Sequence, residues 1–220
     1  DKLIALKIDI DGKNGKVLTS SISKVTDLNV QLSEISDLTG IEGFTALEYL
    51  NCQFNNLSSL NLSQNSKLIE LYCHGNKLTA LDLATNTELT TLQANKNQIA
   101  KLDVSKNTKL VYINVMENAL ISLNLKNGNN TNFQGALLTK NPTLSCIQVD
   151  DAAFATTRTA IFYKDSAANY NVVCVNYTLI PDVNFENKLI SLGIDSGSPD
   201  GKVQTSKISS ITDLDLYNAS

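Results

Sequence analysis

The stretch LTTLQANKNQIAKLDVSKNTK, residues 89–109, is the clearest copy of a unit that recurs every 21 residues along this chain. Five apolar series and one asparagine series keep the same period through four consecutive copies. The apolar series start at Leu47, Leu50, Leu57, Leu60 and Leu62, and the asparagine series is Asn55, Asn76, Asn97 and Asn118. A fixed period of this length is typical of a solenoid, in which each repeat stacks on the one before it.

Each repeat contains two short segments in which apolar and polar residues alternate, as in Leu92–Ala94 and Leu102–Val104. Alternation of this kind predicts a β-strand with one buried face. We therefore expect short parallel strands, little helix, and leucines that point into a shared interior. Each buried leucine contributes roughly 1.5–3 kcal/mol to stability.

The recurring asparagines need a separate explanation, because a buried amide is costly unless it is hydrogen-bonded. We predict that Asn55, Asn76, Asn97 and Asn118 form a structural ladder, in which each side chain bonds to backbone groups where the chain leaves the strand. Stacked copies can also bond to one another. Asn65, Asn86 and Asn107 are expected to form a second ladder at the other corner of the repeat.

The composition restricts the function classes. Of the 220 residues 42% are hydrophobic and 18% charged, the net charge is −4, and no basic patch appears, which argues against nucleic acid as a partner. An apolar run of about 18 residues is missing, which argues against membrane insertion. With one histidine, no tryptophan and no catalytic motif, the chain is not expected to be an enzyme or to bind a cofactor or metal.

The repeat, LxxLx(C/A/V)xxNx(L/I)xxLxLxxNxx, resembles the 21-residue IRREKO-type class of bacterial leucine-rich repeats. Residues 35–57, ISDLTGIEGFTALEYLNCQFNNL, are similar to the internalin-like repeat that often opens such arrays. The segment from NPTLSCIQVDD (residues 141–151) to Cys174 resembles the closing segment of these domains in secreted Bacteroidetes proteins. The resemblance covers roughly residues 26–150 and implies a leucine-rich repeat solenoid, capped at both ends, that acts as an extracellular or cell-surface binding module.

A second periodicity suggests the domain organisation. NGKVLTSSISKVTDLNV, residues 14–30, matches DGKVQTSKISSITDLDL, residues 200–216. Between them, Asp182 is expected to cap a helix that runs through Phe185 and Leu192 and ends at Gly193. The simplest account is a fragment of a longer protein with tandem repeat domains, and the alternative is a terminal segment that caps this one domain.

We therefore predict four parts. Residues 1–46 form an N-terminal cap and the internalin-like first repeat, and residues 47–130 form four 21-residue repeats. Residues 131–175 form a last, degenerate repeat and a C-terminal cap pinned by a disulfide. Residues 176–220 open a second, truncated array.

The cysteines fall into two pairs. Cys146 and Cys174 bracket an irregular segment outside the repeats, and we predict a disulfide between them, which implies an oxidising compartment. Cys52 and Cys73 take a core position that Ala94 fills in the next repeat, so we expect them to be free and buried. A bond between them is less favoured, because side chains stacked on adjacent rungs rarely meet disulfide geometry.

Three motifs suggest other chemistry. His74 follows Cys73 directly, but its side chain should point the opposite way, to solvent, so the two cannot easily share a metal ion. DIDGKNGKV, residues 9–17, resembles the start of a calcium loop but lacks the glycine at position 6 and the glutamate at position 12, so a turn is favoured. Asp165-Ser166-Ala167 resembles a short O-glycosylation motif.

Ligand binding is expected on the exposed strand positions of the concave face. The candidate residues are Tyr49, Asn51, Gln53, Phe54, Glu70, Tyr72, His74, Gln93, Asn95, Tyr112, Asn114 and Met116. Tyrosine suits interfaces, although it is also simply a good strand residue. Two functions remain open: a protein-interaction or adhesion module, or a glycan-binding module attached to a surface or polysaccharide-processing protein.

Overall fold

The computed structural model describes residues 2–10, 12, 14–175 and 177–216. The chain forms two compact units, one ending at Val172 and one beginning at Val173. Asp11 and Lys13, two positions of the calcium-like loop, lie outside the described residues.

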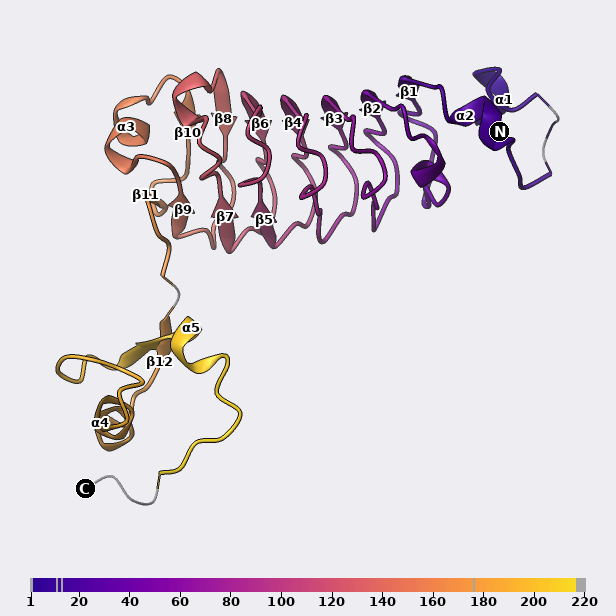
Figure 1. Ribbon diagram of the computed structural model, residues 1–220. Helices are drawn as coiled ribbons and strands as arrows, with labels where there is room; N and C mark the ends of the chain where they lie inside the picture. Colours follow the sequence, from indigo (N-terminus) through magenta and orange to yellow (C-terminus); the bar gives the residue numbers. More distant parts are fainter. Residues whose placement is uncertain (1, 11, 13, 176, 217–220) are drawn as a thin grey trace. The chain divides into compact units, whose positions relative to one another are not determined.

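The first unit is a parallel β-solenoid with two sheets. The larger, seven-stranded sheet has the strand order β1-β2-β3-β4-β6-β8-β10, and all its strands are parallel. Its strands are β1 (Asp27–Asn29), β2 (Tyr49–Asn51), β3 (Glu70–Tyr72), β4 (Thr91–Gln93), β6 (Tyr112–Asn114), β8 (Gly135–Leu137) and β10 (Phe162–Tyr163). The smaller sheet consists of β5 (Lys101–Asp103), β7 (Ser122–Asn124), β9 (Cys146–Gln148) and β11 (Asn169–Asn171). Figure 1 shows the strands of the larger sheet along one edge of the solenoid and β5, β7 and β9 along the other.

Helix is confined to short pieces in this unit, as the sequence predicts. The pieces are α1 (Lys2–Ala5), α2 (Thr19–Ile22), α3 (Ala152–Thr157) and the 3-10 turns η1 (Ile41–Gly43) and η2 (Asn130–Asn132). The expected solenoid of short parallel strands is therefore confirmed.

The middle residue of each three-residue strand in the larger sheet points into the core. Leu50, Leu71, Leu92 and Ile113 pair in register from β2 to β6 and are fully buried. The other apolar series follow them inside, so that one continuous core runs through the solenoid. The 21-residue period thus maps directly onto the rungs.

The first asparagine ladder holds neighbouring rungs together. Asn97 Nδ2 donates to the carbonyls of Cys73 and Ala94, both at 3.1 Å, and its Oδ1 accepts from Leu78 N at 3.0 Å. Asn55, Asn76 and Asn118 make equivalent bonds to backbone groups. The idea that the stacked amides also bond to one another is wrong, because both ends of each side chain already have backbone partners.

Asn141 continues this ladder and was not predicted. Its Nδ2 donates to the carbonyls of Val115 and Leu138, and its Oδ1 accepts from Leu120 N. It lies 23 rather than 21 residues after Asn118, so a strict period misses it.

The second ladder lies at the opposite corner and also bonds to the backbone. Asn86 Nδ2 donates to the carbonyls of Leu62 at 3.1 Å and Asn65 at 2.9 Å. Asn107 repeats this pattern one rung later. Each of these side chains therefore stabilises the turn of the preceding rung.

A left-handed residue precedes each asparagine of the first ladder. Phe54, Gly75, Lys96, Glu117 and Lys140 have φ between 51° and 66°. This conformation is uncommon for residues other than glycine. The left-handed residue ends the strand but keeps a hydrogen bond to the next rung. For example, Phe54 N donates to His74 O at 2.9 Å. Only one of these positions is glycine, so the sequence did not reveal the turn.

The second unit contains a two-stranded antiparallel sheet and two helices. The strands are β12 (Tyr177–Leu179) and β13 (Lys202–Gln204), and the helices are α4 (Val183–Ser191) and α5 (Thr205–Ile208). Asp182 caps α4 as predicted, since its carboxylate accepts from Asn184 N and Phe185 N at 2.9 Å. Ile180, Leu189 and Val203 form the small core.

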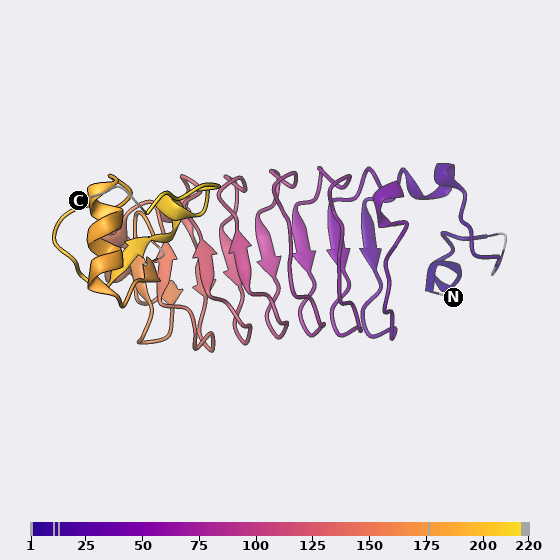
Figure 2. The ribbon, with the colours of Figure 1, turned by 90° about the horizontal axis from the view of Figure 1, so that it is seen from below.

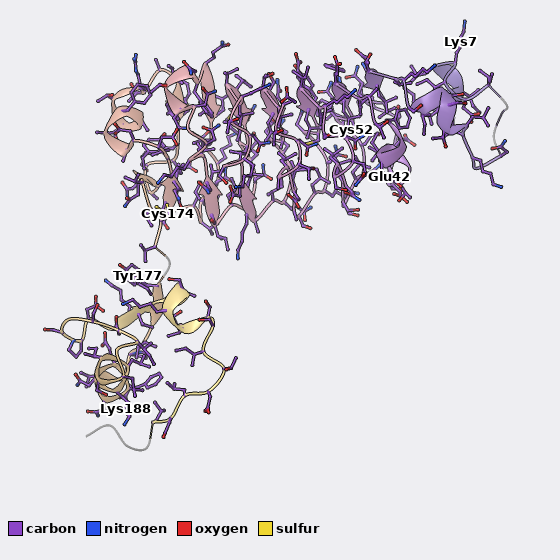
Figure 3. All side chains as sticks on the ribbon, viewed as in Figure 1. Lys7, Glu42, Cys52, Cys174, Tyr177 and Lys188 are labelled. Carbon is purple, nitrogen blue, oxygen red and sulfur yellow. The ribbon has the colours of Figure 1, made fainter. Side chains whose placement is uncertain are left out.

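The cysteines behave as expected for their positions. Cys146 and Cys174 are disulfide-bonded, whereas Cys52 and Cys73 are free and fully buried inside the solenoid, where Figure 3 shows Cys52. Burial raises the pKa of the Cys52 thiol to about 12 and that of Cys73 well above its usual value. These two thiols therefore fill the core as neutral side chains.

Candidate binding face

The first and third residues of β2, β3, β4 and β6 flank the buried middle residue and point away from the core. The first positions align Tyr49, Glu70, Thr91 and Tyr112, and the third positions align Asn51, Tyr72, Gln93 and Asn114. The other predicted residues follow directly after β2, β3, β4 and β6. Figure 2 shows the strands of the solenoid side by side. We call the surface made by the predicted residues on these four strands the sheet face.

Two tyrosines and a glutamate form the centre of the sheet face. The rings of Tyr49 and Tyr72 lie 5.3 Å apart between centroids, tilted by 42°. Tyr72 Oη donates to Glu70 Oε2 at 2.7 Å. This bond, together with burial and the neighbouring charge of Glu70, raises the pKa of Tyr72 to about 12. The phenol of Tyr72 therefore stays neutral. Because its hydroxyl hydrogen is donated to Glu70, its oxygen can accept a hydrogen bond from a ligand.

The raised pKa of Tyr72 gives a testable prediction. The Glu70→Gln variant removes the negative charge that opposes ionisation, so the pKa of Tyr72 should fall from about 12 toward the ordinary value of 10. The measurement is an ultraviolet absorbance titration between neutral pH and pH 13, with Tyr72→Phe used to assign the Tyr72 component. An unchanged Tyr72 component in Glu70→Gln would contradict the role of Glu70.

Asn51 is a correction to the predicted set. It was expected to be an exposed contact residue, but it is only 5% exposed. Its Nδ2 donates to Gln31 Oε1 at 3.3 Å and to Tyr49 Oη at 3.4 Å. Gln53 Nε2 also donates to Gln31 Oε1, so the two glutamines and Tyr49 cover the amide. Asn51 therefore positions its neighbours, and Gln31, from the preceding rung, joins the sheet face.

A second aromatic pair lies where β2 and β3 end. Phe54 and His74 meet edge to face with 5.0 Å between ring centroids, and Phe54 is 45% exposed. Gly75 makes this possible, because a Cβ there would lie 2.5 Å from Phe54 Cδ1. His74 was expected to point to solvent but is half-buried. Burial, and secondly the nearby charge of Lys96, lowers the pKa of His74.

The third tyrosine of the sheet face lies on β6. Tyr112 lies against Gly135, where a Cβ would come within 2.9 Å of Tyr112 Cε2. Glu117 Oε1 and Lys140 Nζ form an ion pair at 2.9 Å next to Met116. The roles of Gly75 and Gly135 could not be predicted from the sequence, because glycine does not recur at the equivalent position of the other repeats. Each leaves space for an aromatic ring on the neighbouring strand.

The contacts described on the sheet face are ring contacts and hydrogen bonds. Among residues 2–10, 12, 14–175 and 177–216, no cluster of three or more His, Cys, Asp or Glu side chains could hold a metal ion. None of the helices in these ranges is long and apolar enough to cross a membrane. The glycosylation-like Asp165 has a structural role, because its carboxylate accepts from Lys140 N at 2.9 Å and Asn141 N at 2.7 Å.

The stacked parallel strands, the buried leucine columns and the asparagine ladders define a leucine-rich repeat solenoid. No protein-family model matches the chain. Over 45 residues the chain is 44% identical to internalin J of Listeria monocytogenes serotype 4b (strain F2365), a match that covers 20% of this chain and 5% of that protein. Similarity to this protein and the solenoid fold support a bacterial leucine-rich repeat protein.

Solved structures show the same likeness. The functional domain of InlJ from Listeria monocytogenes, which includes a cysteine ladder, matches with a TM-score of 0.55 and 28% identity, over 73% of this chain and 38% of that one. An internalin, InlF, from L. monocytogenes strain 4b F2365 matches with a TM-score of 0.47 and 21% identity, over 77% and 54%. In this chain, Cys52 and Cys73 occupy the same core position on successive rungs. The chain spans less than two fifths of the InlJ domain.

Proposed function

We propose that this chain is a non-enzymatic protein-interaction module that binds its partner through the sheet face. The observation that carries the proposal is the group of partly exposed aromatic rings on β2 and β3: Tyr49 against Tyr72, and Phe54 against His74. Aromatic side chains contribute large contact areas at a small entropic cost, and they are enriched among the residues that dominate binding energy. Similarity to the functional domain of InlJ supports a binding role.

An extracellular or cell-surface location, with adhesion or scaffolding as its use, belongs to the same proposal. It is supported by the disulfide-bonded state of Cys146 and Cys174, because disulfides persist mainly in oxidising compartments. In this view residues 131–175 close the solenoid as a cap pinned by the bond between these two cysteines. Residues 176–220 then begin a second repeat array.

Glycan binding is the second candidate, and a specific arrangement favours it. Tyr49 and Tyr72 present ring surfaces, while Gln93, aligned with Tyr72 on the next strand, and Glu70 supply polar groups beside them. Ring faces with adjacent amide and carboxylate groups suit sugars as well as proteins. The module would then belong to a surface or polysaccharide-processing protein.

The two candidates are separated by one experiment with matched variants. Wild type, a Tyr49→Ala/Tyr72→Ala/Tyr112→Ala variant and a Lys101→Ala/Lys106→Ala/Ile121→Ala control are tested on a glycan array. The same three proteins are used to capture partners from surface extracts treated or mock-treated with glycosidases. The control variant changes exposed residues outside the sheet face. Thermal melts verify that all three proteins are folded.

The protein-interaction proposal expects a partner that survives glycosidase treatment, binds wild type and control alike, and is lost with the tyrosine variant. An array signal that only the tyrosine variant loses, together with glycosidase-sensitive capture, would instead establish the glycan alternative. Equal capture by all three proteins would contradict the assignment of binding to the sheet face.

A further inference from the structure

A tyrosine lies between two carboxylates on the first three strands of the larger sheet. Asp27 of β1, Tyr49 of β2 and Glu70 of β3 are in register, so they take the same position on three adjacent strands (Figure 1). Asp27 is exposed, and Glu70 is half-buried. Because neighbouring strands lie about 4.8 Å apart, the backbone positions of the two carboxylates are separated by roughly 10 Å, with Tyr49 between them.

Tyr72 adds a second ring, and we call Asp27, Tyr49, Glu70 and Tyr72 the tyrosine–carboxylate group. The two rings lie 5.3 Å apart between centroids. Tyr72 Oη donates to Glu70 Oε2 at 2.7 Å, and Tyr49 Oη accepts from Asn51 Nδ2 at 3.4 Å. Both phenols are therefore held by neighbours before a partner arrives, and this preorganisation lowers the entropic cost of binding.

The negative charge of this group is not balanced by a cation. Within the described ranges, from residue 2 to residue 216, neither Asp27 nor Glu70 takes part in an ion pair. The first and third residues of β1, β2 and β3, and the second residue after each strand, include no lysine or arginine. Burial, and secondly the charge of Lys96, lowers the pKa of His74, so its ring is neutral at neutral pH. These positions therefore carry two negative charges and no positive one.

We propose that the tyrosine–carboxylate group binds an arginine side chain of a protein partner. The guanidinium plane lies against the rings of Tyr49 and Tyr72, and its N–H groups donate to the carboxylates of Asp27 and Glu70. Glu70 uses Oε2 for Tyr72, which leaves Oε1 to accept from the guanidinium. A lysine supplies the charge but not the planar fork of donors. The inference rests on the proposed function, because it names the partner group that the sheet face recognises.

Charge distinguishes an arginine from the other groups that could meet this surface. A neutral sugar stacked on the two rings would cover Asp27 and Glu70 without supplying an opposite charge, and that desolvation opposes binding. An acidic group would be repelled by both carboxylates. A guanidinium supplies a flat surface for the rings and the opposite charge in one group. The net charge of the chain, −4, also favours the approach of a basic partner.

The test is a nuclear magnetic resonance titration of the whole isotope-labelled chain with Nα-acetyl-arginine amide. Saturable shifts are expected in the backbone amides of residues 27–29, 49–51 and 70–72. Nα-acetyl-citrulline amide has nearly the same shape without the charge, and it should bind at least roughly tenfold more weakly. Absence of saturable shifts at these residues, or equal binding of arginine and citrulline, would overturn the proposal. Equal binding of Nα-acetyl-lysine amide would overturn the assignment to arginine.

Two double variants with the same change in net charge locate the site. The charge variant, Asp27→Asn/Glu70→Gln, keeps the size of both side chains and an acceptor for Tyr72, and it should bind the arginine amide at least roughly tenfold more weakly. The charge control is Asp82→Asn/Asp103→Asn, which changes Asp103 of β5, in the smaller sheet, and the same position of the preceding repeat. It should bind as the wild type does. Equal weakening in both variants would show that binding follows overall charge and would overturn the site.

Partner capture separates a failure of this inference from a failure of the proposed function. The partner that the wild type captures from surface extracts should be lost with the charge variant and kept with the charge control. A partner that is lost with the tyrosine variant but kept with the charge variant would overturn the arginine inference and leave the proposed function standing. Equal capture by the tyrosine variant would overturn the proposed function, and with it the partner's arginine.

Discussion

Replacing Asn97 with alanine is expected to lower the free energy of unfolding by about 3 kcal/mol. The side chain lies inside the turn after β4, where it bonds to the carbonyls of Cys73 and Ala94 and to the amide of Leu78. Alanine leaves the amide of Leu78 buried without this partner. It also removes one of the two bonds that each carbonyl accepts, since Cys73 O keeps its bond from Asn76 Nδ2 and Ala94 O its bond from Asn118 Nδ2. Because these groups belong to two adjacent rungs, the variant weakens the stacking of the solenoid as well as one turn.

The matched control is Asn95→Ala, in the same repeat. Its Oδ1 has no hydrogen-bond partner among the described residues, so little should be lost. Urea unfolding followed by circular dichroism compares both variants with the wild type. Equal loss of stability in the two variants would show that Asn97 has no special structural role.

The Glu186→Ala variant is expected to unfold the second unit while the solenoid stays folded. The carboxylate of Glu186 is the common acceptor for backbone amides at residues 200–202, which connect α4 to β13. Each buried donor left without a partner costs about 1–3 kcal/mol. Among residues 177–216, the core of this unit has three buried apolar side chains, Ile180, Leu189 and Val203, so the unit has little stability to lose.

Hydrogen exchange resolved by mass spectrometry measures the two units separately. In Glu186→Ala, protection should be lost across residues 177–211 and kept across residues 47–130. Asn187→Ala, an exposed change on the same helix, should leave both regions protected. Glu186→Gln keeps one acceptor oxygen and should fall between them. Full protection of residues 177–211 in Glu186→Ala would show that the buried carboxylate is dispensable.

Much of the solenoid could be predicted because its determinants are local and repeated. Leu71, Leu92 and Ile113 take the same place in each unit, and stacking identical units buries identical positions. The asparagine ladder followed from the same logic, since a polar residue that recurs among buried leucines must have a fixed set of partners. Asn141 was not predicted as part of the ladder, because the last repeat is longer by two residues.

The sheet face was predicted as a set of positions but not as a set of contacts. The repeat established that Tyr49, Glu70 and Tyr72 share one side of the sheet. It did not show that Tyr72 donates to Glu70, or that Asn51 is covered by Gln31 from the preceding rung. Such contacts depend on side chains of neighbouring rungs that do not repeat, so a periodic pattern carries no information about them.

The sequence by itself determined the stacking of the rungs, the buried columns and the correspondence between residues 14–30 and 200–216. Only the tertiary structure decided which surfaces are open. Asn51 is covered by Gln31 from the preceding rung, whereas Phe54 is 45% exposed, and Val203 is covered by the segment that contains Ile180. The physical reason is that periodicity specifies which side chains point into the core. The exposure of the remaining side chains depends on whether another part of the folded chain covers them.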